Sequence, residues 1–498
     1  MQLGGGSARG VGLLGAGILA AWWSATAAPS FFPDGYELAA AGACLWGLPP
    51  DPSLPCGALD LGYTTPLFPL LAGPLGLWLG RLGGVVALAL ASMALCWIPL
   101  SALARRLGGA RAVLATGLLL ASSPELRAWA LVPDERPLAL LLVASACAIA
   151  AGAQGLTAAA LAGALAGLSG WARPEALAAA VLIPTGLLLR DRRQALAAGL
   201  SAGALVAGWL VMQRVLGGTW LPRPYEVAAL ELLVLLPDDW AKRLVGMGAW
   251  SPPVRAWGLI NGVPAPSGGF SPDPLAGVAW IGRALAVGSH PAHWLLAGVG
   301  IASALWRPPQ RRALIALLGI MAPWLIASAL LHARLDALPM ANLLVVLLVL
   351  SVLAGAGAGR LGGWAAAWLP ARAGPAVGLV VASSLAVGAG RHWPLSPVRP
   401  GVELSAPGTA ASAWLADHSG VVCSTYESAP IVFRAGRPWQ EWPTPFEPER
   451  WADVDWVVRT HLDVSEPVTL APGTHALEEV AGWAADGRWV RIYSLSSE

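Results

Sequence analysis

The chain has 498 residues, of which 56% are hydrophobic and 12% are charged, whereas a soluble domain averages roughly 25% charged residues. The charge is unevenly placed, because residues 401–498 carry 14 acidic and 6 basic side chains and leave 15 acidic and 25 basic ones to the first 400. This composition excludes a single soluble globule, a disordered chain and a nucleic-acid-binding protein. It predicts a large membrane-embedded part followed by a smaller acidic part in water.

Apolar stretches of helical length recur along the first part of the chain and predict about eleven transmembrane helices. We expect them at residues 11–28, 84–104, 110–123, 136–152, 155–170, 175–189, 195–215, 291–306, 313–331, 339–358 and 375–390. Residues 67–79 are also apolar, but they contain Pro69 and Pro74. Proline interrupts helical hydrogen bonding, so this stretch is expected to lie at the membrane interface or to insert only in part.

Arginine clusters indicate how the predicted helices are oriented. Arg105, Arg106 and Arg111 follow the second span, and Arg190, Arg192 and Arg193 follow the sixth. Arg307, Arg311 and Arg312 follow the eighth span, and Arg360 and Arg372 flank the turn after the tenth. All of them fall on the side of the N-terminus, which the positive-inside rule makes cytoplasmic. The outer side then holds the segments 29–65, 124–135, 171–174, 217–290 and 332–338 and the C-terminal region. We expect a bacterial inner-membrane protein.

Two features of the N-terminal part leave alternatives open. Ala25-Thr26-Ala27 follows an apolar run and also fits the cleavage site of a signal peptide. Cys44 and Cys56 share one polar outer loop and would form a disulfide if that loop faces an oxidising compartment.

The last hundred residues predict a small extracytoplasmic α/β domain. Strand-like runs occur at 421–423, 456–458 and 489–493, and helical stretches occur near 409–417 and 426–435. The segment 391–408 contains four prolines and is the expected linker. The division expected is therefore a transmembrane domain at 1–395 and a soluble domain at 396–498. The tail's tryptophans fit either a glycan-binding surface or, as we favour, the core of the small domain.

Charged side chains gather at the predicted outer ends of the spans. They are Asp34, Glu37, Asp134, Glu135, Arg173, Glu175, His332, Arg334 and Asp336. A charged group at membrane depth costs on the order of 2.5–3.5 kcal/mol, so such positions are informative, and we expect these groups to line an outer cavity. The alternative is that they belong to wet turns, where Asp134 would favour a helix start and the arginines would extend toward water.

Six motifs occur in order along these outer segments. They are Asp34-Gly35-Tyr36-Glu37-Leu38, Gly62-Tyr63-Thr64-Thr65-Pro66-Leu67, Pro133-Asp134-Glu135-Arg136-Pro137-Leu138, Gly167-Leu168 with Arg173-Pro174-Glu175, Gly217-Gly218-Thr219-Trp220-Leu221-Pro222, and Arg334-Leu335-Asp336-Ala337-Leu338-Pro339. Together they resemble the outer loops of GT-C membrane glycosyltransferases, closest to the branch of mycobacterial arabinofuranosyltransferases and related mannosyltransferases. The resemblance covers roughly residues 10–395. Gly35 stands where many members have a second acidic residue, and Arg223-Pro224-Tyr225 replaces an Asn-Thr element.

The resemblance implies a mainly α, GT-C type fold and a hexosyl- or pentosyltransferase. Its donor would be a sugar on a polyprenyl phosphate, and its acceptor a glycan, lipid or protein of the cell envelope. Asp34 would be the catalytic base, Asp134 and Glu135 would orient the acceptor or bind a metal ion, and Arg173 and Arg334 would bind the donor phosphate. The remaining expected substrate contacts are Glu37, Tyr63, Glu175, Arg223, Tyr225 and His332. A divalent cation, Mg²⁺ or Mn²⁺, is the one cofactor left open.

Two other functions remain as alternatives. A transporter or flippase of a lipid-linked saccharide would also have many spans and a polar outer cavity, although it would more naturally show internal repeats. A non-catalytic scaffold could share the same fold, and the replacement at Gly35 is the feature that favours it.

Overall fold

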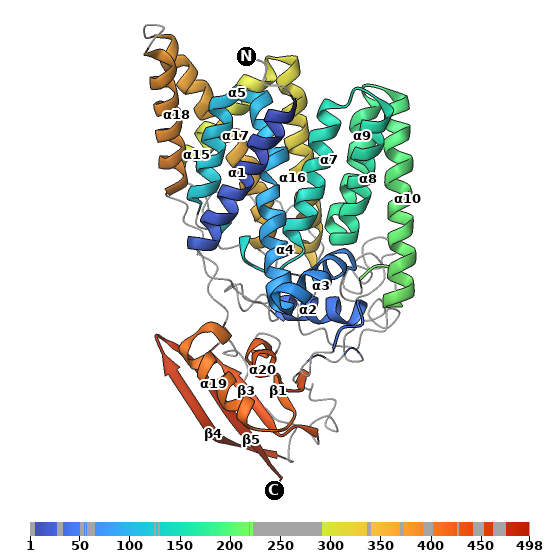
Figure 1. Ribbon diagram of the computed structural model, residues 1–498, viewed down its shortest axis with the longest axis vertical. Helices are drawn as coiled ribbons and strands as arrows, with labels where there is room; N and C mark the ends of the chain where they lie inside the picture. Colours follow the sequence, from blue (N-terminus) through green and yellow to red (C-terminus); the bar gives the residue numbers. More distant parts are fainter. Residues whose placement is uncertain are drawn as a thin grey trace.

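The computed structural model describes residues 5–26, 33–49, 54, 56, 65–123, 126–127, 130–218, 220–222, 291–335, 340–368, 373–391, 402–425, 428–441, 453–461 and 475–497. Their architecture is a bundle of long helices with a sheet-containing unit at one end (Figure 1). Two short helices, α2 (Pro33–Leu45) and α3 (Leu67–Leu79), lie at that same end, between the bundle and the sheet (Figure 1).

Every segment expected to span the membrane is helical in the structure. The bundle consists of α1 (Gly5–Thr26), α4 (Arg81–Leu95), α5 (Trp97–Ser122), α7 (Arg136–Gly152), α8 (Leu156–Ala172), α9 (Ala178–Leu188) with the 3-10 helix η1 (Pro174–Leu177), α10 (Arg192–Gly217), α15 (Pro291–Leu305), α16 (Pro308–Leu335), α17 (Met340–Ala367) and α18 (Gly374–Arg391). The expected break after residue 104 falls at Gly109 inside α5, whose φ of 72° is not helical. Such a φ favours glycine, because a side chain would clash with the backbone there.

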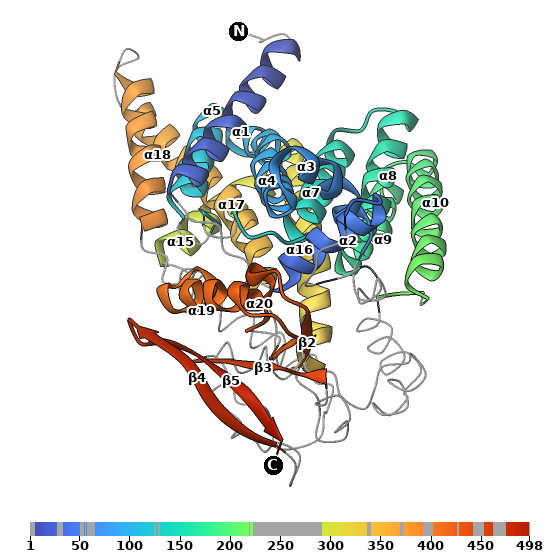
Figure 2. The same ribbon diagram turned by 60° about the horizontal axis from the view of Figure 1, so that its bottom comes forward.

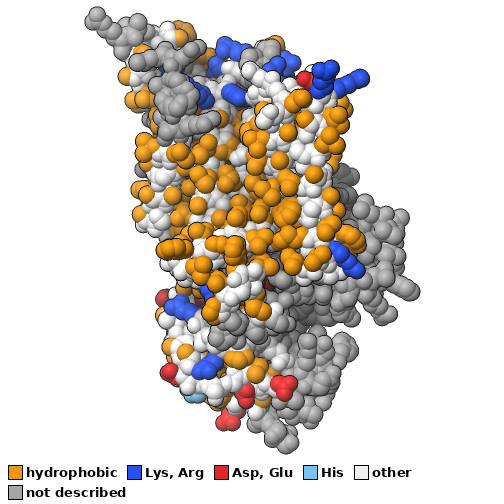
Figure 3. All heavy atoms as spheres, turned by 45° about the vertical axis from the view of Figure 1, so that its right-hand side comes forward, with side chains coloured by type: hydrophobic (Ala, Val, Ile, Leu, Met, Phe, Trp, Pro, Cys, Tyr) orange, Lys and Arg blue, Asp and Glu red, His pale blue; other side chains and the backbone are white. Residues whose placement is uncertain are grey.

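The helices and their surface mark an integral membrane protein. Among the described residues, three segments are long and apolar enough to cross a bilayer on their own, Arg81–Ser122, Arg192–Leu216 and Val345–Ala367. The other apolar helices are shorter, so the number of about eleven spans stays a prediction. Figure 3 shows hydrophobic side chains covering the middle of the bundle, with basic side chains gathered at the end away from the sheet.

Small residues bring α17 close to its neighbours. A Cβ added to Gly357 would collide with the carbonyl of Leu296 in α15, and one added to Gly362 would collide with that of Gly378 in α18. Small residues allow helices in membranes to approach closely. Helix α17 remains helical past residue 360 and ends at Ala367. The expectation that Arg360 flanks a turn is therefore wrong, because Arg360 lies inside the helix.

Several arginines at the basic end bind the carbonyls that close helices. Arg311 donates to Leu305 O at 3.0 Å, Arg190 donates to Ala150 O at 3.0 Å, and Arg360 donates to Leu107 O at 2.9 Å. The last carbonyls of a helix have no partner within it, and a cation there also complements the helix dipole. These side chains thus stabilise helix ends in addition to marking one side of the bundle.

The part of the chain between α1 and α4 is stabilised by a disulfide and a side-chain hydrogen bond. Cys44 and Cys56 form a disulfide, and Trp46 Nε1 donates to Leu70 O at 2.9 Å. Helix α3 has the bounds expected for the interfacial stretch, and its exposed side chains include Leu71, Leu75, Trp78 and Leu79. An apolar face of this kind fits a helix that lies along the membrane interface.

The C-terminal unit contains the helices and strands expected from the sequence and two further strands. In chain order it has η2 (Val402–Leu404), α19 (Ala406–Asp417), β1 (Val422–Ser424), α20 (Ala429–Ala435), β2 (Trp439–Glu441), β3 (Trp456–Thr460), β4 (His475–Ala485) and β5 (Arg488–Ser497). The described strands form one sheet in the order β2-β1-β3-β5-β4. Strand β1 pairs in parallel with β2 and β3, and β5 pairs antiparallel with β3 and β4.

The core of this unit explains most of the tail's described tryptophans. Its buried centre includes Val422, Val458 and Ile492, and the partly buried tryptophans that pack against it are Trp414, Trp439, Trp456 and Trp483. This agrees with the core interpretation for these four side chains. The expected linker 391–408 is shorter in the structure, because η2 and the start of α19 already belong to the folded unit. The expected boundary between residues 395 and 396 lies outside the described residues.

Candidate functional site

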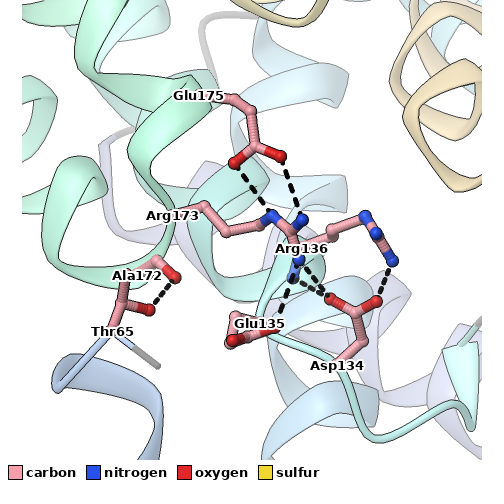
Figure 4. Close-up of polar contacts among 7 residues, drawn as sticks. All are labelled: Thr65, Asp134, Glu135, Arg136, Ala172, Arg173 and Glu175. Carbon is pink, nitrogen blue, oxygen red and sulfur yellow. Dashed lines mark hydrogen bonds and ion pairs between the residues drawn. The ribbon is translucent and has the colours of Figure 1, made fainter. Parts of the chain in front are cut away.

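One arginine contacts three carboxylates where α8 ends and α7 begins (Figure 4). Arg173 donates from Nε and Nη2 to both oxygens of Glu175 at 3.0 and 2.9 Å, a bidentate pair. Its Nη1 lies 3.4 Å from Asp134 Oδ1 and 3.3 Å from Glu135 Oε2. Asp134 and Glu135 come from the segment before α7, and Arg173 and Glu175 come from the turn after α8. All four are assigned to the site from the sequence, and they lie next to one another in the structure.

The local sequence holds Arg173 in place at the end of α8. Residue 174 is proline, which disfavours helical backbone at the preceding residue, and Arg173 is accordingly extended, with φ −154° and ψ 132°. The chain then turns at once into η1, which carries the buried Glu175. Glu175 thus lies two residues beyond Arg173, within reach of its guanidinium.

Asp134 lies two residues before the first residue of α7 and also belongs to the charged cluster. Its Oδ1 accepts the backbone N–H of Arg136 at 2.8 Å, and its Oδ2 pairs with Arg136 Nη1. The side chains of Asp134 and Arg136 are each only 6% exposed. The helix-start interpretation of Asp134 is thereby confirmed, and the same carboxylate also reaches Arg173 in the neighbouring segment.

Two further residues at this place lie in the sequence motifs but have no role assigned from the sequence. The Asp-x-Arg spacing at a helix start is the available signal for Arg136. Thr65 lies two residues before α3, and its Oγ1 donates to Ala172 O at 2.5 Å. No sequence pattern relates Thr65 to Ala172, since the pair is separated by 107 residues.

The first acidic motif lies against the second. A Cβ added to Gly35 in α2 would come within 2.6 Å of Pro133 Cγ, so Gly35 packs directly against the ring of Pro133. Asp34 precedes Gly35 and Asp134 follows Pro133, so the two acidic motifs meet through Gly35 and Pro133. Glycine at position 35 thus has a structural reason, because any larger residue would push α2 away from Pro133. The side chain of Asp34 lies outside the described part of the structure.

Other expected site residues are only partly described. Glu37 lies in α2 and is half-buried. His332 and Arg334 belong to the last turns of α16, a helix that packs against η1 and α7, but their side chains are not described. Tyr63, Arg223, Tyr225 and Asp336 lie outside the described residues.

The described carboxylates do not form a divalent-cation site as they stand. Asp134, Glu135 and Glu175 are each paired with an arginine, and no group of three or more His, Cys, Asp or Glu within the described residues is arranged to hold a metal ion. A carboxylate in a buried ion pair has lost its hydration shell and interacts with the guanidinium instead.

Comparison by sequence finds no protein family that matches the chain, and no curated protein matches it either. Solved structures do match. ArnT from Cupriavidus metallidurans in the apo state has a TM-score of 0.56 and 15% identity, with 98% of each chain covered. The same protein bound to undecaprenyl phosphate has a TM-score of 0.54 and 16% identity, over 97% of this chain and 98% of that one.

An Archaeoglobus fulgidus oligosaccharyltransferase in the apo form also matches, with a TM-score of 0.48 and 14% identity over 98% of this chain and 74% of that one. The likeness to ArnT extends over nearly the whole chain and shows its fold. The chain has the GT-C fold, as the sequence motifs indicated.

Proposed function

We propose that the chain is a glycosyltransferase that moves a sugar from a polyprenyl-phosphate donor to an acceptor outside the cytoplasm. The observation that carries the proposal is the meeting of the two acidic motifs through Gly35 and Pro133, beside the buried Asp134 and Arg173. The GT-C fold adds support, because its solved example ArnT binds undecaprenyl phosphate. A lipid-linked donor also gives a reason for the reaction to take place in a membrane protein.

The proposed reaction is a single displacement at the anomeric carbon. An acceptor hydroxyl is a poor nucleophile, so a carboxylate accepts its proton while its oxygen attacks that carbon. We assign this role to Asp34. The bond between the anomeric carbon and the phosphate oxygen breaks, and its electron pair leaves with the phosphate. The charge that develops there is stabilised by guanidinium groups, for which Arg334 and Arg173 are the candidates.

The geometry around Arg173 suggests how its proposed role works. Its bidentate pair with Glu175 spans 2.9–3.0 Å, whereas its contacts with Asp134 and Glu135 are longer, at 3.4 and 3.3 Å. A donor phosphate would replace the longer contacts at Nη1 and leave the pair with Glu175 in place. Asp134 and Glu135 would then orient the acceptor beside Asp34.

The proposed orientation places this cluster outside the cytoplasm. The basic end of the bundle, which the positive-inside rule assigns to the cytoplasm, lies opposite the sheet-containing unit (Figure 3). The Cys44–Cys56 disulfide is at the end nearer that unit, and disulfides persist in oxidising compartments. We therefore propose a bacterial inner-membrane enzyme with a transmembrane domain at 1–395 and an extracytoplasmic domain at 396–498.

The test is a transfer assay with the full-length protein in lipid vesicles. Polyprenyl-phosphate sugars are supplied with glycan, lipid and peptide acceptors, and the products are analysed by mass. We expect one acceptor to gain the mass of a single sugar, with an equal amount of polyprenyl phosphate released. The mass gained distinguishes a hexosyl- from a pentosyltransferase.

The same assay separates the alternative functions. A transporter or flippase would move the lipid-linked saccharide across the vesicle membrane and leave the bond between sugar and phosphate intact. A non-catalytic scaffold would do neither. Translocation without release of polyprenyl phosphate, or no reaction with any donor, would contradict the proposal.

A further inference from the structure

The sheet-containing unit touches the helix that carries Asp34. Helix α20 packs against α2, and Figures 1 and 2 show that α20 is on the side of the unit that faces the bundle. The contact is aromatic, because the rings of Tyr36 and Phe433 lie 5.3 Å apart and the rings of Phe433 and Trp439 lie 5.2 Å apart. Tyr36 and Phe433 are each only 6% exposed.

This contact is a small hydrophobic core of its own. Its buried members come from three segments, α2, the loop closed by the disulfide, and α20, and they are Tyr36, Ala40, Leu54, Ala429 and Phe433. We call this set the α2–α20 junction. Burial of these aromatic and aliphatic side chains removes apolar surface from water, and this favours the contact between the two parts.

Helix α2 is held on two different faces. Residues 35, 38, 39 and 42 recur at helical spacing and form one face of α2. Leu38 and Ala39 belong to the core of the helical part, Gly35 meets Pro133, and a Cβ on Gly42 would lie 2.9 Å from Pro69 O in α3. Tyr36 and Ala40, four residues apart, form the other face and belong to the junction. The direction of the first turn of α2 therefore depends on Pro133 from one side and on Phe433 from the other.

From this arrangement we infer that Phe433 is a positioning residue for the proposed transfer reaction, acting through Tyr36 on the Asp34 turn of α2. This rests on the proposed function, in which Asp34 is the base. Phe433 touches no substrate. Its contribution is to keep the first turn of α2 at the distance from Asp134 and Arg173 that the reaction requires. A misplacement of about 1 Å at a reacting group is enough to slow a reaction on the order of a hundredfold.

The experiment compares two neighbouring substitutions on α20 in the full-length protein. Phe433→Ala removes the ring that contacts Tyr36, whereas Ile431→Ala removes a side chain buried in the core of the C-terminal unit. We expect Phe433→Ala to lower kcat about tenfold to a hundredfold with little change in the KM for the donor. We expect Ile431→Ala to lower the Tm of the unit while kcat stays within about twofold. Phe433→Leu should restore most of the rate, and it also serves if the alanine variant does not fold.

Hydrogen–deuterium exchange gives a readout that needs no enzymatic activity. In Phe433→Ala, and not in Ile431→Ala, the amides of residues 36–45 should exchange faster, while those of α4 stay unchanged. A Tyr36→Ala and Phe433→Ala double variant should exchange no faster than either single variant, because both remove the same contact. Unchanged exchange in α2, or equal loss of rate in both alanine variants, would overturn the inference. A wild-type protein that transfers no sugar would instead contradict the proposed function, and the exchange experiment would still test the junction.

Discussion

The guanidinium of Arg173 contacts three carboxylates, two from the segment before α7 and one from η1 after α8. Its side chain is 13% exposed, and those of Asp134 and Glu175 are 6% and 2% exposed. Removing one partner of a buried ion pair leaves the other charge without compensation, and this usually costs more than the pair itself contributes. The cluster is therefore a point at which single substitutions have large effects.

The first prediction concerns the stability that Arg173 provides. Arg173→Ala should destabilise the protein by about 3–5 kcal/mol, because it removes the guanidinium that pairs with both oxygens of the buried Glu175. Arg491→Ala is the matched control, since it removes the arginine of an ion pair whose side chains are 51% and 43% exposed. That change should cost less than about 1 kcal/mol. Thermal unfolding of the two variants measures the difference, and equal losses of Tm would contradict the buried network.

The stability of the C-terminal unit should depend on pH through the buried carboxyl of Glu403. Burial raises the pKa of its carboxyl to about 7. A backbone hydrogen bond and the charge of Arg434 lower the pKa, but by less than burial raises it. Between the unfolded value of 4.5 and about 7 the folded state holds a proton that the unfolded state has released. Stability therefore falls as the pH rises through this window.

The corresponding variant is Glu403→Gln, which keeps the size of the side chain and removes its charge. It should flatten the fall in Tm between pH 5 and 7 and raise stability above pH 7 by about 3 kcal/mol, the equivalent of the shift in pKa. Glu478→Gln, a change on β4 of the same unit, is the control and should leave the profile as it is. An unchanged slope in Glu403→Gln would show that this carboxyl is not the group that titrates.

At the scale of elements, the disulfide ties the end of α2 to the loop that follows it, because Cys44 lies in α2 and Cys56 in that loop. The bond joins residues separated by 12 positions, and Leu54 inside the closed loop is 5% exposed within the α2–α20 junction. Replacing both Cys44 and Cys56 by serine should lower stability by about 2–4 kcal/mol. Thermal unfolding with and without a reducing agent checks this. The reductant should lower the Tm of the wild type and leave the double variant unchanged, whereas an equal response of both would argue against the bond.

Sequence patterns locate some elements closely and miss others, for physical reasons. An interfacial segment is expected at 67–79 because its hydrophobicity and prolines are local features, and helix α3 has the same bounds, Leu67–Leu79. Strand β4 was missed because its Ala and Glu residues do not favour strands, and its pairing with β5 overrides that preference. The available signal was Asp486-Gly487, whose φ values of 53° and 74° make the tight turn between the two strands.

The site divides in the same way. Asp134, Arg173 and Glu175 were found because each lies at the end of an apolar run, where a charged residue stands out. Their mutual contacts, the bond from Thr65 to Ala172 and the contact of Phe433 with Tyr36 could not be found, because these pairs are far apart in sequence and follow no period. A single sequence indicates which groups are unusual, and the packing of helices decides which of them meet.

At the scale of the whole molecule, the charge asymmetry and the fold agree. Basic side chains gather at one end of the bundle, and the sheet-containing unit lies at the other (Figures 1 and 3). The GT-C fold relates this arrangement to ArnT over nearly the full length of both chains. The proposed reaction at the outer end follows from that arrangement together with the two acidic motifs.

The most direct test is the rate of sugar transfer by Asp34→Asn relative to the wild type, in the vesicle assay with the donor that the wild type uses. Asparagine keeps the size of the side chain and cannot accept the proton, so we predict a loss of kcat on the order of 10²–10⁴-fold with donor binding retained. Asp191→Asn, at the start of α10 on the basic end, is the matched control and should keep the wild-type rate. Transfer by Asp34→Asn at the wild-type rate would contradict the assignment of the reaction to the place where α2 meets Pro133.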